Sequence, residues 1–127
     1  MPGSHVDEPL AISAEAHRGT AVVSLSGMLD VSSADAFRTA LLGQLHEGAT
    51  RTVVDFTGVR FVDSSGLNAL VAVHRRYRAT DAELWLVIDD PKLLRLLEIT
   101  GLDDHFRVFP TLDALTGGED GTTEGDT

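Results

Sequence analysis

The chain has 127 residues, a length that fits one domain and leaves no room for a second. Twenty acidic residues against ten basic ones give a formal net charge of -10, which disfavours nucleic acid or an anionic membrane as a direct partner. The absence of cysteine excludes disulfides and thiolate metal sites. Because the sequence shows neither a secretory signal nor a long apolar run, we expect a cytoplasmic protein.

The N-terminal part of the chain predicts a β-hairpin. Residues 21–29 are β-rich, and Val23 and Leu25 share one face of the expected strand. Residues 12–16 alternate more weakly between polar and apolar side chains. Arg18-Gly19-Thr20 lies between the two segments and suits a turn, so we expect the segments to form a hairpin.

An amphipathic helix is predicted after the second strand. Ser32 or Ser33 offers an N-cap, and Gly48 supplies a C-terminal stop. Between these points, apolar side chains recur at the spacing of one helix face: Phe37, Ala40, Leu41 and Leu45.

The middle of the chain predicts a strand, a polar turn and a second helix. Residues 52–56 read as a strand that Gly58 interrupts, and apolar character resumes at 61–62 before the turn at 63–66. The helix is indicated by five residues that share one face: Leu67, Leu70, Val71, His74 and Tyr77. On this face we interpret His74 as a core histidine with satisfied hydrogen bonds, and not as a metal ligand.

The C-terminal third predicts two short strands and two helices. Residues 84–88 are all apolar, as in a strand that is buried on both faces. Pro91 suits the first turn of a helix that ends at Gly101. Its inward residues are expected to be Leu93, Leu94, Leu96 and Leu97. Residues 106–109 predict a last strand, and residues 111–115 a marginal final helix.

The order of these elements defines the fold class. Strands that alternate with helices imply an α/β (α+β layered) domain, with a mainly parallel or mixed sheet of about five strands and about four helices. We expect this domain over residues 10–116, after a flexible N-terminus at 1–9. Residues 117–127 contain only glycine, threonine and acids, a composition that predicts a disordered tail. The pattern of strands and helices over residues 12–115 is self-contained, so we expect a monomer when the protein is alone.

The turn Asp63-Ser64-Ser65-Gly66 is the most informative part of the sequence. One interpretation is helix capping, which explains one of the three small polar side chains. The other is phosphorylation, because the free amides and the dipole of a helix N-terminus favour the added negative charge. A partner docked over the turn would not tolerate that charge, since burying it without a cation is costly.

The sequence gives little support for an enzyme. It contains no G-x-S-x-G nucleophile motif, no P-loop and no G-x-G-x-x-G motif, and its five histidines are scattered. We therefore predict neither a catalytic site nor a metal site, and no cofactor.

Residues 53–67, which read VVDFTGVRFVDSSGL, resemble the central motif of STAS-domain anti-sigma factor antagonists. Residues 27–30 are similar to the G-x-L-D turn of that family, and residues 94–101 to its third helix. The resemblance spans about 12–115. It implies a switch in which the unphosphorylated domain binds an anti-sigma factor that is also a serine kinase, so that the sigma factor is released. Phosphorylation would end the binding, and a serine phosphatase would restore it.

The resemblance also implies the site residues. It places phosphorylation on Ser65, with Ser64 as the alternative. Because parallel strands present their carboxyl ends together, we also expect the Asp30 turn and the Asp63 turn to be neighbours at one end of the sheet. The partner contacts expected there are Asp30, Asp63, Ser64, Ser65, Gly66 and Asn68. Two other classes stay open: a STAS scaffold subunit of a stress-signalling or lipid-transport complex, and a small enzyme or nucleotide-binding protein.

Overall fold

A computed structural model describes residues 9–115 of the chain. The predicted tail at 117–127 lies outside these residues, and so does the predicted flexible N-terminus apart from Pro9. The extents of these two segments therefore stay predictions. The described residues include the hairpin, the central motif and the whole of the predicted strand and helix series.

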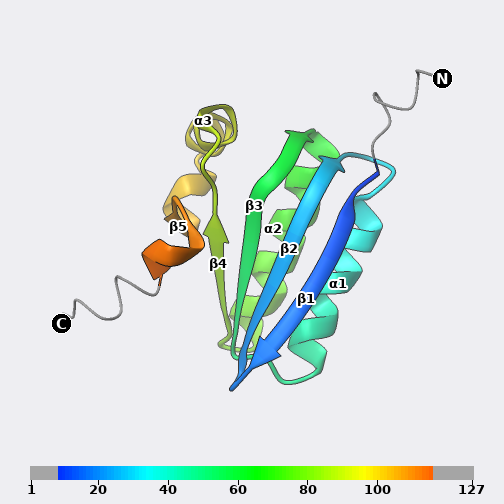
Figure 1. Ribbon diagram of the computed structural model, residues 1–127, viewed down its shortest axis with the longest axis vertical. Helices are drawn as coiled ribbons and strands as arrows, with labels where there is room; N and C mark the ends of the chain where they lie inside the picture. The colour runs from blue at the N-terminus through cyan, green and yellow to red at the C-terminus, as the bar shows by residue number, and fades with distance from the viewer. Residues whose placement is uncertain (1–8, 116–127) are drawn as a thin grey trace.

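The strands form one mixed sheet, as the sequence predicts (Figure 1). Strand β1 (Ala11–His17) pairs antiparallel with β2 (Thr20–Leu29). Parallel pairing then joins β2 to β3 (Arg51–Val62), β3 to β4 (Glu83–Val87) and β4 to β5 (Arg107–Phe109). The order across the sheet is β1-β2-β3-β4-β5, so neighbours in the chain are neighbours in the sheet.

The helices connect the parallel strands. They are α1 (Ala34–His46), α2 (Ser64–Ala79), α3 (Pro91–Thr100) and the short 3₁₀ helix η2 (Leu102–His105). Residues 112–115 are also helical, where the final helix was predicted. Helices α1 and α2 lie side by side on one face of the sheet (Figure 1). This arrangement follows from the strand order, because successive crossovers of the same hand place their helices on the same face.

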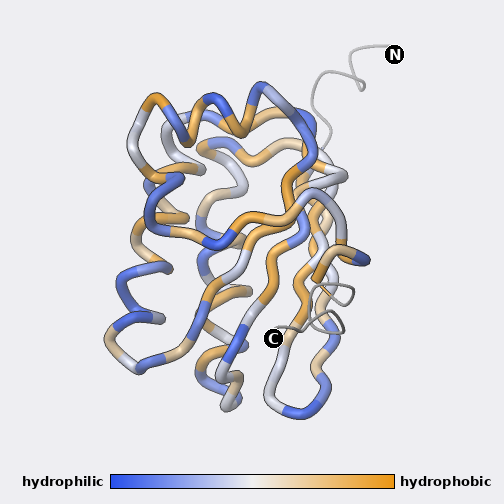
Figure 2. Tube along the Cα trace, turned by 90° about the vertical axis from the view of Figure 1, so that its left-hand side faces the viewer, coloured by the Kyte–Doolittle hydropathy of each residue, from blue (hydrophilic) through white to orange (hydrophobic). Residues whose placement is uncertain are grey.

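The core has two parts, one on each face of the sheet. The larger part lies beneath the helices and includes Leu84, Leu86 and Ile88 from the fourth predicted strand. Trp85 and Val87 point to the other face, where they form a smaller cluster. The prediction that residues 84–88 are buried on both faces is therefore confirmed. In Figure 2 the strands are largely hydrophobic in colour, whereas several of the connecting turns are hydrophilic.

The prediction that Gly58 interrupts the third strand is wrong. Strand β3 continues from Arg51 to Val62, with register shifts against β2. A Cβ atom at Gly58 would lie 2.7 Å from the Leu25 carbonyl oxygen and 2.9 Å from Ser26 Cβ. The glycine thus allows β2 to approach closely at an irregular point of the ladder, where we expected a break.

Two predicted helix faces also need correction. In α2 the buried side chains are Ala69, Leu70, Val73 and Tyr77, whereas Leu67, Val71 and His74 are only half-buried. The buried face is rotated because α2 packs against α1 as well as against the sheet. In α3 only Leu93 and Leu97 are buried. Leu96 is half-buried and Leu94 is 38% exposed, so the inward position predicted for Leu94 is wrong.

His74 differs from the sequence interpretation in its hydrogen bonding. Its Nε2 atom is buried and has no hydrogen-bond partner within the described residues. The ring packs against Phe106, with 4.7 Å between the ring centroids, and lies 5.9 Å from the ring of His105. The His74 side chain therefore packs α2 against the segment that follows α3. It is not a core histidine with satisfied hydrogen bonds.

Candidate functional site

The turns that follow β2 and β3 lie next to each other. In the parallel register Leu29 is paired with Val62, at the carboxyl ends of the two strands. The Asp63 amide donates a 3.1 Å hydrogen bond to the Leu29 carbonyl oxygen, which joins the second turn to the first. The expected proximity of the Asp30 and Asp63 turns is confirmed.

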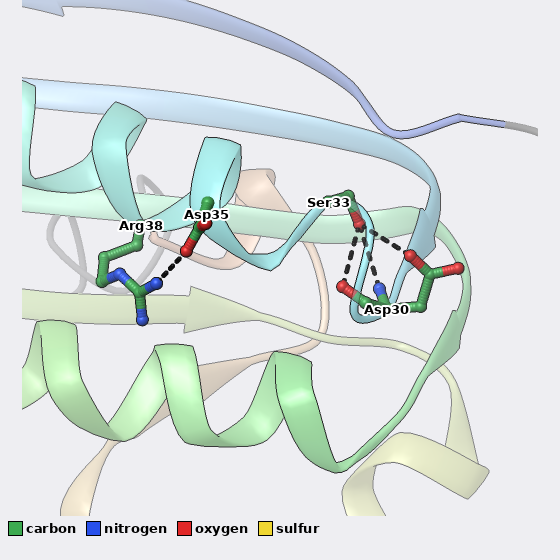
Figure 3. A network of polar contacts seen from close by, with 4 residues as sticks. All are labelled: Asp30, Ser33, Asp35 and Arg38. Atoms are coloured by element: carbon green, nitrogen blue, oxygen red, sulfur yellow. Dashed lines mark hydrogen bonds and ion pairs between the residues drawn. The ribbon is translucent and has the colours of Figure 1, made fainter.

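The Asp30 turn is held by side-chain hydrogen bonds. Asp30 Oδ1 accepts from the Ser32 amide at 3.0 Å and from the Ser32 hydroxyl at 2.7 Å. The Ser33 hydroxyl donates to the Met28 carbonyl oxygen at 2.8 Å and accepts from the Asp30 amide at 3.0 Å. Figure 3 shows Asp30 and Ser33 facing each other across this turn. The hydrogen bonds, above all that from the Ser32 side chain, lower the pKa of the Asp30 carboxyl group.

Ser33 occupies the N-cap position of α1, but its side chain does not cap that helix. The hydroxyl is directed back toward the end of β2 and stabilises the turn. At the same end of α1, Asp35 and Arg38 form an exposed ion pair (Figure 3). Of the two predicted caps, Ser33 therefore has the predicted position and a different role.

Asp63 is the side-chain cap of α2. Its backbone is extended, and its Oδ1 atom accepts a 3.1 Å hydrogen bond from the Gly66 amide. Within the described residues, neither the Ser64 nor the Ser65 hydroxyl has a hydrogen-bond partner. Capping thus accounts for one of the three small polar side chains and leaves both serine hydroxyls free for another role.

The two serines differ in exposure. Ser64 is exposed, Ser65 is half-buried, and Asn68 is exposed one helical turn after Ser64. Gly66 is buried because α2 begins against the end of β2: a Cβ atom there would lie 2.7 Å from Leu29 Cγ. The structure therefore gathers all six predicted site residues at one end of the sheet.

The arrangement at the start of α2 is electrostatically favourable for an added negative charge. The first amides of a helix lack partners within the helix. At the start of α2 the Gly66 amide is bonded to the Asp63 side chain, which leaves the Ser64 and Ser65 amides without a helical partner. A negative charge added to a hydroxyl there would lie at the positive end of the helix dipole. A kinase that reaches the hydroxyl would still have to supply ATP as the phosphoryl donor and remove the hydroxyl proton, and the helix N-terminus would stabilise the phosphate once it is attached.

Two apolar residues at the same end of the sheet were not among the site residues predicted from the sequence. Val31 is 77% exposed and Phe61 is 49% exposed. A valine between the polar residues Asp30 and Ser32 was the available signal, because the turn itself does not require an apolar side chain.

The described residues can also be searched for metal clusters and membrane-spanning helices. Residues 9–115 contain no group of three or more histidine, aspartate or glutamate side chains that could hold a metal ion. No helix among them is both long enough and apolar enough to cross a bilayer.

Comparison with known proteins places this chain in a family. The family model described as the STAS domain matches residues 11–115. The anti-sigma-F factor antagonist RsfB of Mycobacterium tuberculosis is 32% identical over 111 residues, which cover 87% of this chain and 90% of RsfB. An anti-sigma F factor antagonist of Paenibacillus polymyxa is 31% identical over 109 residues, 82% of this chain and 87% of its own.

A solved structure agrees with these sequence relatives. The crystal structure of an anti-sigma factor antagonist from Mycobacterium paratuberculosis superimposes with a TM-score of 0.76 and 33% sequence identity. The match covers 85% of this chain and 92% of that chain. The chain therefore belongs to the STAS domain family, and the resemblance identified from the central motif is confirmed.

Proposed function

We propose that this STAS domain is an anti-sigma factor antagonist that is switched by serine phosphorylation. In its unphosphorylated form it binds an anti-sigma factor, and the sigma factor is released. The anti-sigma factor is also the serine kinase, and its phosphorylation of the domain ends the binding. A serine phosphatase resets the switch. We propose further that the protein is cytoplasmic and that it is a monomer when alone. In this reaction it is the substrate of the kinase.

The observation that carries the proposal is that only one of the three small polar side chains at the start of α2 is used to cap the helix. Among residues 9–115, Asp63 is the side chain that caps the helix, and the Ser64 and Ser65 hydroxyls beside it have no hydrogen-bond partner. Relatives of similar length that are named anti-sigma factor antagonists support the same activity. We assign the phosphoryl group to Ser65, the second serine of the motif, with Ser64 as the alternative.

The switch follows from the electrostatics of burial. The partner covers the Asp30 and Asp63 turns, so a phosphoryl group on either serine would lose its water on binding. A buried charge without a cation costs several kcal/mol. Each ~1.4 kcal/mol lowers affinity tenfold, so a single phosphate is sufficient to end the complex.

Phosphorylation with a purified kinase tests the proposal. The protein is incubated with ATP and a candidate anti-sigma factor kinase from the same organism, and its intact mass is measured. We expect a gain of one phosphate and loss of the complex on a size-exclusion column. A scaffold subunit would bind without modification, and an enzyme would consume ATP or another substrate without gaining mass. Either result would contradict the proposal.

A further inference from the structure

Two large apolar side chains are exposed at the same end of the sheet as the serine turn. Val31 follows Asp30 in the turn after β2, and Phe61 lies two residues before Asp63 at the end of β3. The paired strand ends and the hydrogen bond from Asp63 to Leu29 hold the two turns together. Val31 and Phe61 therefore belong to the same end of the sheet as the serines.

The fold does not account for Val31. Its side chain is 77% exposed and belongs to neither hydrophobic cluster. The turn around it is fixed by the hydrogen bonds of Asp30, Ser32 and Ser33, which involve no atom of the valine side chain. A polar residue at this position would keep these bonds and remove an apolar group from water.

The rigidity of the turn favours binding through Val31. A β-branched side chain has few rotamers, and the turn holds its backbone in place. Little conformational entropy is therefore lost when a partner buries this side chain. Val31 is already positioned to enter an apolar pocket of another protein.

Phe61 provides a second apolar contact beside a small hollow. The hollow has a volume of about 110 Å³, lies between the end of β3 and α3, and is lined by apolar and charged residues: Val59, Arg60, Val62, Asp90, Lys92, Leu93 and Leu96, together with Phe61 itself. Aromatic side chains are enriched in the buried centres of protein interfaces. The volume suits one side chain of a partner protein.

We propose that Val31 and Phe61 are the apolar anchors of the surface that binds the anti-sigma factor kinase. The matching kinase surface has apolar pockets for the two side chains and basic residues that face the Asp30 and Asp63 carboxylates. This inference rests on the proposed function, because it names the contacts of the same partner. The basic residues are already paired with the two carboxylates, so a phosphate on Ser65 would be buried near the apolar pockets without a cation of its own.

The test compares Val31→Ser with Ile99→Ser. Ile99 is 69% exposed near the end of α3 and lines neither the hollow nor the two turns, so it is a matched aliphatic control. Isothermal titration calorimetry without ATP measures the Kd of each variant for the purified anti-sigma factor kinase of the same organism. We expect Val31→Ser to weaken binding by about tenfold or more, equivalent to ~1.4 kcal/mol, and Ile99→Ser to leave it unchanged. Thermal melts verify that both variants are folded.

The outcomes separate the anchors from the function as a whole. If the unsubstituted protein binds and Val31→Ser binds equally well, the anchor assignment is overturned and the switch stands. If Val31→Ser and Ile99→Ser weaken binding equally, Val31 contributes no more to the interface than the control residue, and the anchor assignment again fails. If the unsubstituted protein does not bind the kinase, the proposed function fails together with its anchors.

Discussion

Gly66 and Leu29 approach each other so closely that a Cβ atom on Gly66 would lie 2.7 Å from Leu29 Cγ and 3.0 Å from the Leu29 carbonyl oxygen. The contact sets the position of the serine turn, because it fixes the start of α2 against the end of β2. Any larger residue at Gly66 must move the helix or the strand end.

Gly66→Ala is therefore expected to destabilise the protein by about 1–3 kcal/mol, the usual cost of overpacking. Gly43→Ala is a matched control inside α1, because a Cβ atom there meets nothing within 4 Å. That substitution should stabilise the protein by roughly 0.5–1 kcal/mol through helix propensity. Urea unfolding measures both changes, and equal effects of the two substitutions would contradict the close contact.

The second prediction concerns the cap of α2. Asp63→Ala should cost ~1 kcal/mol, because it removes the acceptor for the Gly66 amide. Asp63→Asn should keep most of the stability, since asparagine caps about as well as aspartate. Ser64→Ala should change the free energy of unfolding little. A larger loss for Ser64→Ala than for Asp63→Ala in chemical denaturation would show that the cap is assigned to the wrong residue.

The burial of His74 predicts that the free energy of unfolding depends on pH. Burial lowers its pKa from the ordinary value of 6.5, with smaller contributions from Arg78 on the same helix and His105 on η2. Because the folded state holds the neutral ring, this contribution is complete above pH 6.5 and is lost as the pH falls below that value. His74→Leu should therefore lose less stability than the unsubstituted protein between pH 7.5 and pH 5.5.

Urea unfolding at the two pH values measures this difference, with His46→Gln as the control at an exposed helix end. If His74→Leu and the unsubstituted protein lose the same free energy of unfolding on acidification, His74 does not titrate as proposed.

Hydrogen bonds of two buried hydroxyl groups, on Tyr77 and Thr52, link α1, α2 and β3. The Tyr77 hydroxyl donates to the Leu41 carbonyl oxygen at 2.6 Å and is 2.7 Å from Thr52 Oγ1. Tyr77→Phe leaves the buried Thr52 hydroxyl without this partner, so we expect a loss of about 1–3 kcal/mol. In a double-mutant cycle with Thr52→Val, the second substitution should cost less once the first is present. Strictly additive losses would contradict the coupling.

The sequence predicted the features that depend on local periodicity and chain order. Residues 84–88 alternate between the two clusters as expected, and the Asp30 and Asp63 turns are neighbours because the two parallel strands end together. It failed where tertiary contacts decide the outcome. Gly58 allows a close strand approach that no local pattern reveals, and the exposure of Leu94 depends on how little of α3 the rest of the fold covers.

The site was predictable to a similar extent. The motif and the topology identified the turn and its neighbours, but the sequence left three residues as possible caps. Only the direction of the Asp63 side chain resolves this choice. Val31 was overlooked, because exposure depends on the path of the chain around it.

Salt dependence tests the expected charge of the partner. If basic residues of the kinase face the carboxylates of Asp30 and Asp63, the Kd should rise as ionic strength increases, because the Debye length falls to about 8 Å at 0.15 M salt. Titrations between low and physiological salt measure this effect. An affinity that is indifferent to salt would argue against a basic partner surface.

The most direct test of the switch compares Ser65→Ala, Ser64→Ala and Ser65→Asp with the purified anti-sigma factor kinase and ATP, by intact mass and by binding affinity. Ser65→Ala should gain no phosphate and stay bound, whereas Ser64→Ala should still gain one. Ser65→Asp should remain folded, since a carboxylate at a helix N-terminus is stabilising by about 0.3–1 kcal/mol, but it should bind poorly. If Ser65→Ala still gains one phosphate while Ser64→Ala gains none, the assignment to Ser65 is contradicted and Ser64 is the modified residue.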